Sequence, residues 1–150
     1  MIPLVKGSSL LKDFISEFHK EPYLKINVIL AGVIMMIFIY SGIFSPEKNN
    51  YPVVCFHEKI TGEPCASCGL SHSFSLIELG RITEAYTWNP YGMRIFLFFL
   101  GRLLMRVVYS AYFFVYRGNR KQLIALDISG SVIMFLFSFW PLLRQLALSL

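Results

Sequence analysis

Long apolar stretches dominate the chain, and three of them approach or reach the length of a membrane span. They cover residues 26–44, 91–116 and 123–143. A helix needs about 20 residues to cross the hydrocarbon core of a bilayer. Because lipid offers no hydrogen bonds to the backbone, segments of this length cross it as helices. We therefore predict an all-α membrane protein with about three transmembrane helices.

The three stretches differ in their polar content. The first has no charged residue, the second contains Arg94, Arg102 and Arg106, and the third contains Asp127 near its start and Pro141 near its end. Arg102 and Arg106 are four residues apart, so they share one helix face. A charge at the centre of a span costs about 2.5–3.5 kcal/mol on insertion scales and usually faces protein or water. We expect the two arginines to serve structure or assembly, with a conduction or substrate path as the alternative.

Asp127 is one candidate partner for Arg106. It lies near the start of the third stretch, and the long side chain of Arg106 can extend toward it. A lipid phosphate is an equally physical partner for a buried guanidinium. The sequence leaves both pairings open.

Residues 1–25 precede the first span and carry an amphipathic pattern. The apolar residues at helical spacing are Leu10, Leu11, Phe14, Ile15 and Phe18, and they lie opposite Lys12, Asp13 and Glu17. Ser8 or Ser9 can cap such a helix, and Pro22 is expected to end it. We predict a helix that lies on the membrane surface, or alternatively packs on a partner.

The composition favours one small membrane-embedded domain over residues 1–150. Hydrophobic residues make up 55% of the chain and charged residues only 15%, which disfavours both disorder and an ordinary solvated domain. The formal net charge is +5, and the basic residues flank apolar spans without forming a continuous patch. This pattern favours contact with membrane lipids over binding of nucleic acid.

The basic residues also predict the orientation of the chain. Three spans place the termini on opposite faces of the membrane, and the more basic short segments usually stay in the cytoplasm. The side of the N-terminus has Lys6, Lys12, Lys20, Lys25, Arg117, Arg120 and Lys121, whereas the other side has Lys48, Lys59, Arg81, Arg94 and Arg144. We therefore expect a cytoplasmic N-terminus and an extracytoplasmic segment over residues 45–90.

That segment contains all three cysteines and two of the three histidines: Cys55, Cys65, Cys68, His57 and His72. In an oxidising compartment, Cys55 can form a structural disulfide with Cys65 or Cys68. Zinc is the second hypothesis, with Cys65, Cys68 and His72 as ligands and Cys55 or His57 as a further one. No other cofactor is expected.

Thiol redox catalysis is the third hypothesis for these cysteines. Cys65 and Cys68 form a CxxC motif before a predicted helix, whose N-terminus would stabilise a thiolate. However, the sequence has no strand–helix–strand pattern of a thioredoxin fold, and Cys55 alone remains as a relay for electrons. Redox catalysis is therefore the less favoured interpretation, and the sequence favours a protein that is not an enzyme.

The residues after the CxxC motif predict short helices and a corner. Leu70, Phe74 and Ile77 have helical spacing, so a helix too short to span should run from the motif to Gly80 along the outer interface. A second short surface helix should begin near Thr83, Glu84 and Ala85. Asn89 can cap the second span, with Pro90 at its first helical position. The aromatic residues Tyr86, Trp88 and Tyr91 would anchor this corner at the interface.

The run TGEPCASCGLSHSFSLIELGRITEAYTWNP, residues 61–90, resembles the motif of an uncharacterised bacterial membrane-protein family, domain of unknown function 2752. The matching positions are Cys55, Gly62, Pro64, Cys65, Cys68, Gly69, Leu79, Gly80, Ala85, Asn89 and Pro90. Ala66 stands where the family usually has Pro, and Ser71 and His72 stand where it usually has Thr and Arg. The resemblance implies a small helical protein of the bacterial cytoplasmic membrane. The resemblance also weakens the hypothesis that the family binds zinc, since Arg, which the family usually has at the position of His72, is a poor metal ligand.

Together these observations favour a non-catalytic accessory or assembly subunit. Its cysteine-rich segment would be a disulfide-stapled extracytoplasmic cap, and its partners would be membrane lipids and another membrane protein or a second copy of the chain. The alternatives are a membrane-bound thiol–disulfide redox protein that uses Cys65 and Cys68, and a Cys/His metal-binding membrane protein.

Overall fold

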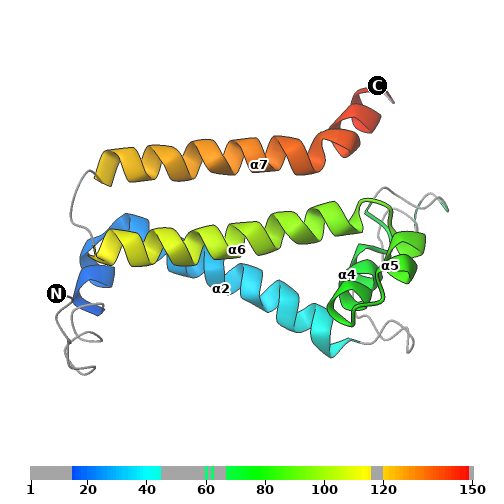
Figure 1. The fold of residues 1–150 in the computed structure, drawn as a ribbon, viewed down its shortest axis with the longest axis horizontal. Helices are drawn as coiled ribbons and strands as arrows, with labels where there is room; N and C mark the ends of the chain where they lie inside the picture. The colour runs from blue at the N-terminus through cyan, green and yellow to red at the C-terminus, as the bar shows by residue number, and fades with distance from the viewer. Residues whose placement is uncertain (1–14, 45–59, 61, 63–66, 116–119, 149–150) are drawn as a thin grey trace.

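The chain folds as a set of helices in a computed structural model that describes residues 15–44, 60, 62, 67–115 and 120–148 (Figure 1). The helices are α2 (Pro22–Ile43), α4 (Leu70–Glu78), α5 (Ile82–Trp88), α6 (Gly92–Val115) and α7 (Arg120–Leu148). No strand occurs in this part of the chain. The predicted all-α fold and the short helix after the CxxC motif are confirmed.

Three helices are long and apolar enough to cross a membrane: Pro22–Ile43, Gly92–Val115 and Arg120–Arg144. The first span begins at Pro22 rather than at residue 26, because Pro is favoured in the first turn of a helix, where its missing N–H costs nothing. The third continues through Pro141 to Leu148, beyond the predicted end at residue 143. Its ribbon bends toward the C-terminal end, as expected when a proline removes a helix hydrogen bond (Figure 1).

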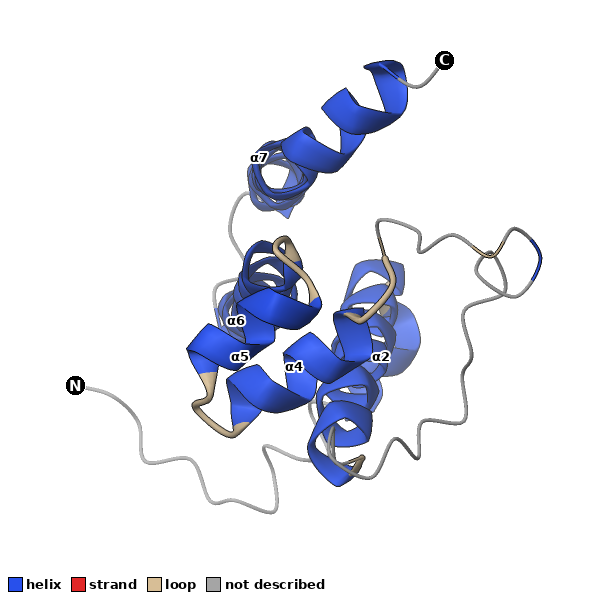
Figure 2. Cartoon of the chain, turned by 90° about the vertical axis from the view of Figure 1, so that its right-hand side faces the viewer, coloured by secondary structure: helices blue, strands red, loops and turns tan. Residues whose placement is uncertain are grey.

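Helix α6 lies between α2 and α7, and α4 and α5 pack at the end where α2 ends and α6 begins (Figures 1 and 2). Helix α6 is the central element, since it packs against α2, α4, α5 and α7. We call the end with α4 and α5 the motif end, and the opposite end, where α2 begins, the N-terminal end.

The N-terminal end is closed by a small apolar core. Leu24, Phe113 and Leu123, one from each long helix, are buried together, and Phe18 packs against them. Residues 15–20 are helical, and the chain breaks at Glu21 before α2 begins. This described part of the predicted amphipathic helix therefore packs on the bundle, while residues 8–14 of that prediction lie outside the described residues.

The second core lies at the motif end and joins α4 and α5 to α6. Leu76, Ile77 and Ala85 are buried there, with Met93 and Phe96 of α6 packed against them. Because α4 is amphipathic, its apolar face covers the start of α6. This packing fixes the position of the residues that match the family motif.

Helices α6 and α7 pack closely through glycine and methionine pairs. A Cβ atom added at Gly101 would lie 2.5 Å from the Met134 Cε atom, and one added at Gly130 would lie 3.0 Å from the Met105 Cε atom. Each methionine end thus covers a glycine of the opposite helix. Small residues at these positions let two membrane helices approach closely.

Candidate functional site

The residues around Cys68 and Asn89 form a tight corner at the motif end. Gly69 precedes α4 with a left-handed φ of 75°, and a Cβ atom there would lie 2.6 Å from the carbonyl oxygen of Trp88. Both the backbone angle and the close approach therefore require glycine. Asn89 is 2% exposed, and its Nδ2 atom donates a 3.0 Å hydrogen bond to the Cys68 carbonyl. The backbone of Cys68, the second cysteine of the CxxC motif, is thus hydrogen-bonded to the residue that ends α5.

Asn89 also shapes the turn that leads into α6. Its Oδ1 atom accepts a 2.9 Å hydrogen bond from the Tyr91 N–H group, and its carbonyl accepts one of 3.1 Å from Gly92. The helix begins at Gly92, so Pro90 lies in the turn and not at the first helical position as predicted. The physical reason is that an Asn side chain readily bonds the N–H group two residues ahead, which forms a turn of its own.

One further contact packs α4 against α6, and a glycine ends the helix. A Cβ atom at Gly92 would lie 2.0 Å from the Ser73 Oγ atom, so α4 and α6 nearly touch at this point. At the other end of α4, Gly80 has a φ of 76°, and Arg81 donates a 2.8 Å backbone bond to the Leu76 carbonyl. This pattern is a Schellman ending, which explains the glycine of the motif.

The end of α2 is tied to α4 by a buried hydroxyl group. Ser75 Oγ lies 2.6 Å from the Ser41 carbonyl and 3.0 Å from the Phe44 carbonyl, both at the end of α2. The Glu78 carboxyl lies close to Gly42, where an added Cβ atom would be 2.8 Å from Oε2. Burial raises the pKa of Glu78 above its ordinary value.

His72 is half-buried at the corner formed by Cys68 and Asn89. Its ring stacks on Trp88 with 4.1 Å between the centroids and 11° between the planes. Burial lowers the pKa of His72, which favours the neutral imidazole. In the described residues, no group of three His, Cys, Asp or Glu side chains is arranged to hold a metal ion.

Several predicted site residues fall outside the described part of the chain. These are Cys55, His57, Pro64 and Cys65, whereas Gly62 is described and exposed. The disulfide pairs and the zinc ligand set therefore remain predictions. Cys68 is half-buried and directly precedes the N-cap residue of α4.

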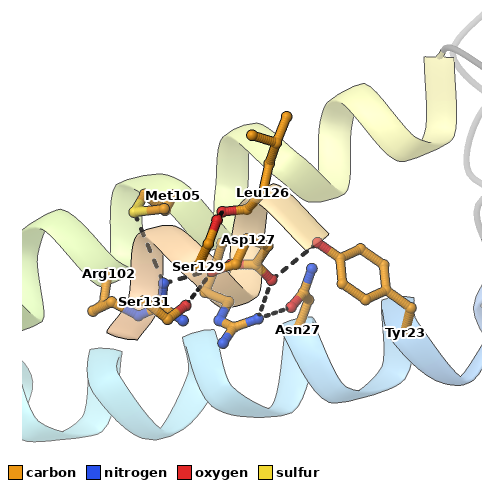
Figure 3. Close-up of polar contacts among 9 residues, drawn as sticks. Tyr23, Asn27, Arg102, Met105, Leu126, Asp127, Ser129 and Ser131 are labelled. Carbon is orange, nitrogen blue, oxygen red and sulfur yellow. Dashed lines mark hydrogen bonds and ion pairs between the residues drawn. The ribbon is translucent and has the colours of Figure 1, made fainter. Parts of the chain in front are cut away.

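A second polar site lies between the three long helices (Figure 3). Arg106 Nη1 lies 2.8 Å from Asp127 Oδ2, and Arg102 Nη1 lies 3.4 Å from Asp127 Oδ1. The Tyr23 hydroxyl donates to Asp127 Oδ2 at 3.0 Å, and Arg106 Nη1 also donates to Asn27 Oδ1. We call these five residues, Tyr23, Asn27, Arg102, Arg106 and Asp127, the ion cluster.

The ion cluster is enclosed by the bundle. The side chains of Arg102, Arg106 and Asp127 are 8%, 12% and 3% exposed, so all three lie mostly within the bundle, with Arg106 at its edge. The structure thus brings together the three charged residues selected from the sequence. It adds Tyr23 and Asn27, which the sequence analysis missed. Their signal was a polar pair at i and i+4 on the first span, where Asn27 is an isolated amide among apolar residues.

A third set of polar residues lies at the N-terminal end. Arg120 forms ion pairs with Glu17, at 3.1 Å, and with Glu21, and its guanidinium lies 4.7 Å from the centroid of the Phe113 ring. These contacts connect the start of α7 to the segment that precedes α2. Since the partners are about a third exposed or less, they add to the packing of this end without forming a buried site.

Two grooves open on the sides of the long helices. One, of about 390 Å³, lies between α2 and α6 and is lined by Asn27, Val28, Ala31, Arg106, Val107, Ser110, Ala111 and Phe114. The other, of about 320 Å³, is lined by Arg94 of α6 and by Leu136, Phe137 and Trp140 of α7. The first borders the ion cluster, and neither is lined by motif residues.

The fold and these sites define a multi-pass helical membrane protein with three candidate spans. Residues 55–103 match the family described as "Protein of unknown function (DUF2752)", which confirms the resemblance found in the sequence. The matched segment contains the motif, α4, α5 and the first half of α6, and it ends before Arg106 and Asp127. No curated protein and no solved structure matches the chain.

Proposed function

We propose that this chain is a non-catalytic accessory or assembly subunit of the bacterial cytoplasmic membrane. The observation that carries the proposal is that the described motif residues hold α4, α5 and the start of α6 together. Asn89 binds the Cys68 carbonyl, and Gly69 admits the close approach of the Trp88 carbonyl. Because these residues fix the packing of the corner, they support a rigid structural cap rather than a catalytic site.

In this proposal the N-terminus lies in the cytoplasm, and residues 45–90 form an extracytoplasmic cap stapled by a disulfide. The orientation is supported by the basic residues near the N-terminal end, among them Lys20, Lys25, Arg120 and Lys121. The disulfide is supported by the oxidising character of the outer compartment and by the small core at the motif end.

The test is purification of the tagged chain from its native membrane in mild detergent. We expect a defined set of membrane proteins to co-purify with it. The double variant Arg102→Leu, Arg106→Leu should reduce that set, while a matched variant at a lipid-exposed position of α6, Val108→Leu, should not. A chain that elutes alone before any substitution would contradict the proposed function.

A thiol–disulfide redox protein that uses Cys65 and Cys68 is the second candidate. The supporting observation is that Cys68 directly precedes the N-cap of α4, where helix N–H groups favour a thiolate. A membrane-impermeant thiol reagent applied to intact cells, before and after mild reduction, separates the candidates. Labelling only after reduction supports the stapled cap, whereas labelling without reduction supports redox activity, or metal binding if a chelator is required. Labelling only after lysis would contradict the orientation.

A further inference from the structure

We propose that the groove between α2 and α6 binds a transmembrane helix of another protein that carries an Asp or Glu side chain at the depth of Arg106. This inference rests on the proposed assembly function and specifies the chemistry of the partner. It is carried by the charge of the ion cluster, by the Nη2 and Nε donors of Arg106, which have no partner within the described residues, and by the shape of the groove.

The ion cluster has one more positive charge than negative. It pairs two guanidinium groups, Arg102 and Arg106, with the single carboxylate of Asp127. Asp127 is also the only acidic residue in the sequences of the three candidate spans. An unbalanced charge among apolar helices is costly. A second carboxylate would make the cluster neutral.

Arg106 has the donors to bind that carboxylate. Its Nη1 atom makes both hydrogen bonds, to Asn27 and to Asp127. Within the described residues, its Nη2 and Nε atoms bond to nothing, and the side chain lines the groove. A guanidinium group binds carboxylates well through two parallel N–H donors.

The groove itself fits a helix. Ala31 of α2 and Ser110 and Ala111 of α6 line it, and small residues let the backbone of a neighbouring membrane helix approach closely. The remaining lining is apolar apart from Asn27 and Arg106. The groove is therefore mostly apolar, with Asn27, Arg106 and Ser110 as its polar residues.

Depth and composition argue against the other occupants. Arg106 is nine residues from the end of α6 at Val115, or about 14 Å along a helix that rises 1.5 Å per residue. This places it near the middle of the span, away from lipid phosphates, which lie outside a hydrocarbon core of about 30 Å. A second copy of the chain supplies no carboxylate in its spans except Asp127, which is 2% exposed.

The test uses the purified full chain in phosphatidylcholine vesicles with synthetic membrane-spanning Leu/Ala peptides of about 20 residues. One series carries a single Glu at positions one helical turn apart, and a matched series carries Gln. Energy transfer between the labelled chain and peptide measures binding. We expect the best Glu peptide to bind about tenfold more tightly than its Gln counterpart. The preference should depend on the position of the Glu.

Two variants locate the binding. Arg106→Gln should abolish the preference for Glu, and Ala111→Phe should block the groove without changing the ion cluster. Val108→Phe adds the same bulk at a position that is 60% exposed, and it should bind the peptide like the unmodified chain. If Arg106→Gln fails to fold, the comparison of Ala111→Phe with Val108→Phe still decides the question.

Equal binding of the Glu and Gln peptides would overturn the inference, as would full binding by the Ala111→Phe variant. Two labelled copies of the chain can also be tested for energy transfer. If they show it and Ala111→Phe abolishes it, the groove serves self-association. If the peptides show no preference for Glu, and the chain binds an anionic phospholipid that the Arg106→Gln variant loses, the groove is a lipid site. Either result overturns the helix proposal while co-purification in the native membrane still supports the assembly function.

Discussion

Asn89 shows how a single side chain can hold three segments of a small membrane protein. Its amide donates to the carbonyl of Cys68, accepts from the N–H group of Tyr91, and is almost fully buried. A buried amide that meets both its donor and acceptor needs is stable only in one arrangement of its neighbours. The corner is therefore specified by hydrogen-bond geometry as well as by apolar packing.

The contact between Gly92 and Ser73 leads to the first prediction. Gly92→Ala should destabilise the chain by about 1–3 kcal/mol, because its Cβ atom would overlap the Ser73 side chain. Gly32→Ala is the control, since nothing lies within 4 Å of its added Cβ atom. Thermal unfolding in detergent measures both. Equal midpoints for the two variants would contradict the close contact.

The stacked imidazole of His72 predicts a dependence of stability on pH. Burial lowers the pKa of His72 in the folded chain below its ordinary value of 6.5. Below pH 6.5 the unfolded chain binds a proton that the folded chain does not, so the contribution of His72 is full above that pH and is lost as the pH falls toward the folded pKa.

We therefore expect the unfolding midpoint to decrease between about pH 7.5 and about pH 5.5, and to decrease less in His72→Phe. The Phe variant keeps an aromatic ring against Trp88 but cannot titrate. Glu78 acts in the opposite sense, because its raised pKa stabilises the folded chain as the pH falls. The comparison of the two chains isolates His72, and identical pH profiles would refute this prediction.

At the scale of elements, α6 organises the molecule. It contacts every other helix that the structure describes, and it contributes to both apolar cores and to the ion cluster. In contrast, α7 packs mainly along one side of α6, which leaves many of its apolar side chains exposed. The stability of α7 in the bundle therefore depends on its contacts with α6 and on Asp127.

The glycine and methionine pairs between α6 and α7 predict a graded response to size. Gly101→Ala should have a small effect, because the flexible end of Met134 can move away from the new methyl group. Gly101→Ile should cost about 1–3 kcal/mol, and a second change, Met134→Ala, should recover part of that loss. Unfolding midpoints of the three variants test this order. No recovery in the double variant would show that Met134 is not the obstacle.

At the scale of the whole molecule, polar contacts at several depths connect the helices. The corner joins α4, α5 and α6 at the motif end, the ion cluster joins α2, α6 and α7 between the ends, and Arg120 connects the N-terminal end. Since apolar side chains gain little from contact with each other rather than with lipid, polar contacts and close packing determine the arrangement of membrane helices.

This view predicts how the ion cluster responds to partial and complete removal. Arg106→Leu should destabilise the chain by about 3–5 kcal/mol, because Asp127 would keep only its longer contact with Arg102 and the Tyr23 hydroxyl. Replacing Arg102, Arg106 and Asp127 together by Leu should restore much of the stability, since no unpaired charge remains. Chemical unfolding in mixed micelles compares the variants. A triple variant as unstable as the single one would contradict the argument.

The sequence predicted the helices well because span length and helical spacing are local properties. It selected Arg102, Arg106 and Asp127, since charges stand out in apolar segments. It missed Tyr23 and Asn27, whose role depends on which face of α2 meets α6, and that is a property of the packed bundle. It also misplaced Pro90, because the choice between a turn and a helix start depends on the contact of Asn89 with Cys68.

The order of residues in the ion cluster has a consequence for biosynthesis. Tyr23 and Asn27 are synthesised first, Arg102 and Arg106 follow, and Asp127 emerges last. The second span is therefore synthesised, with its two arginines, before their carboxylate partner has been made. Cations without a counter-charge are poorly accepted by the bilayer. Stable insertion of the second span should thus wait for the third, so that a nascent chain halted before Asp127 remains at the channel or is degraded.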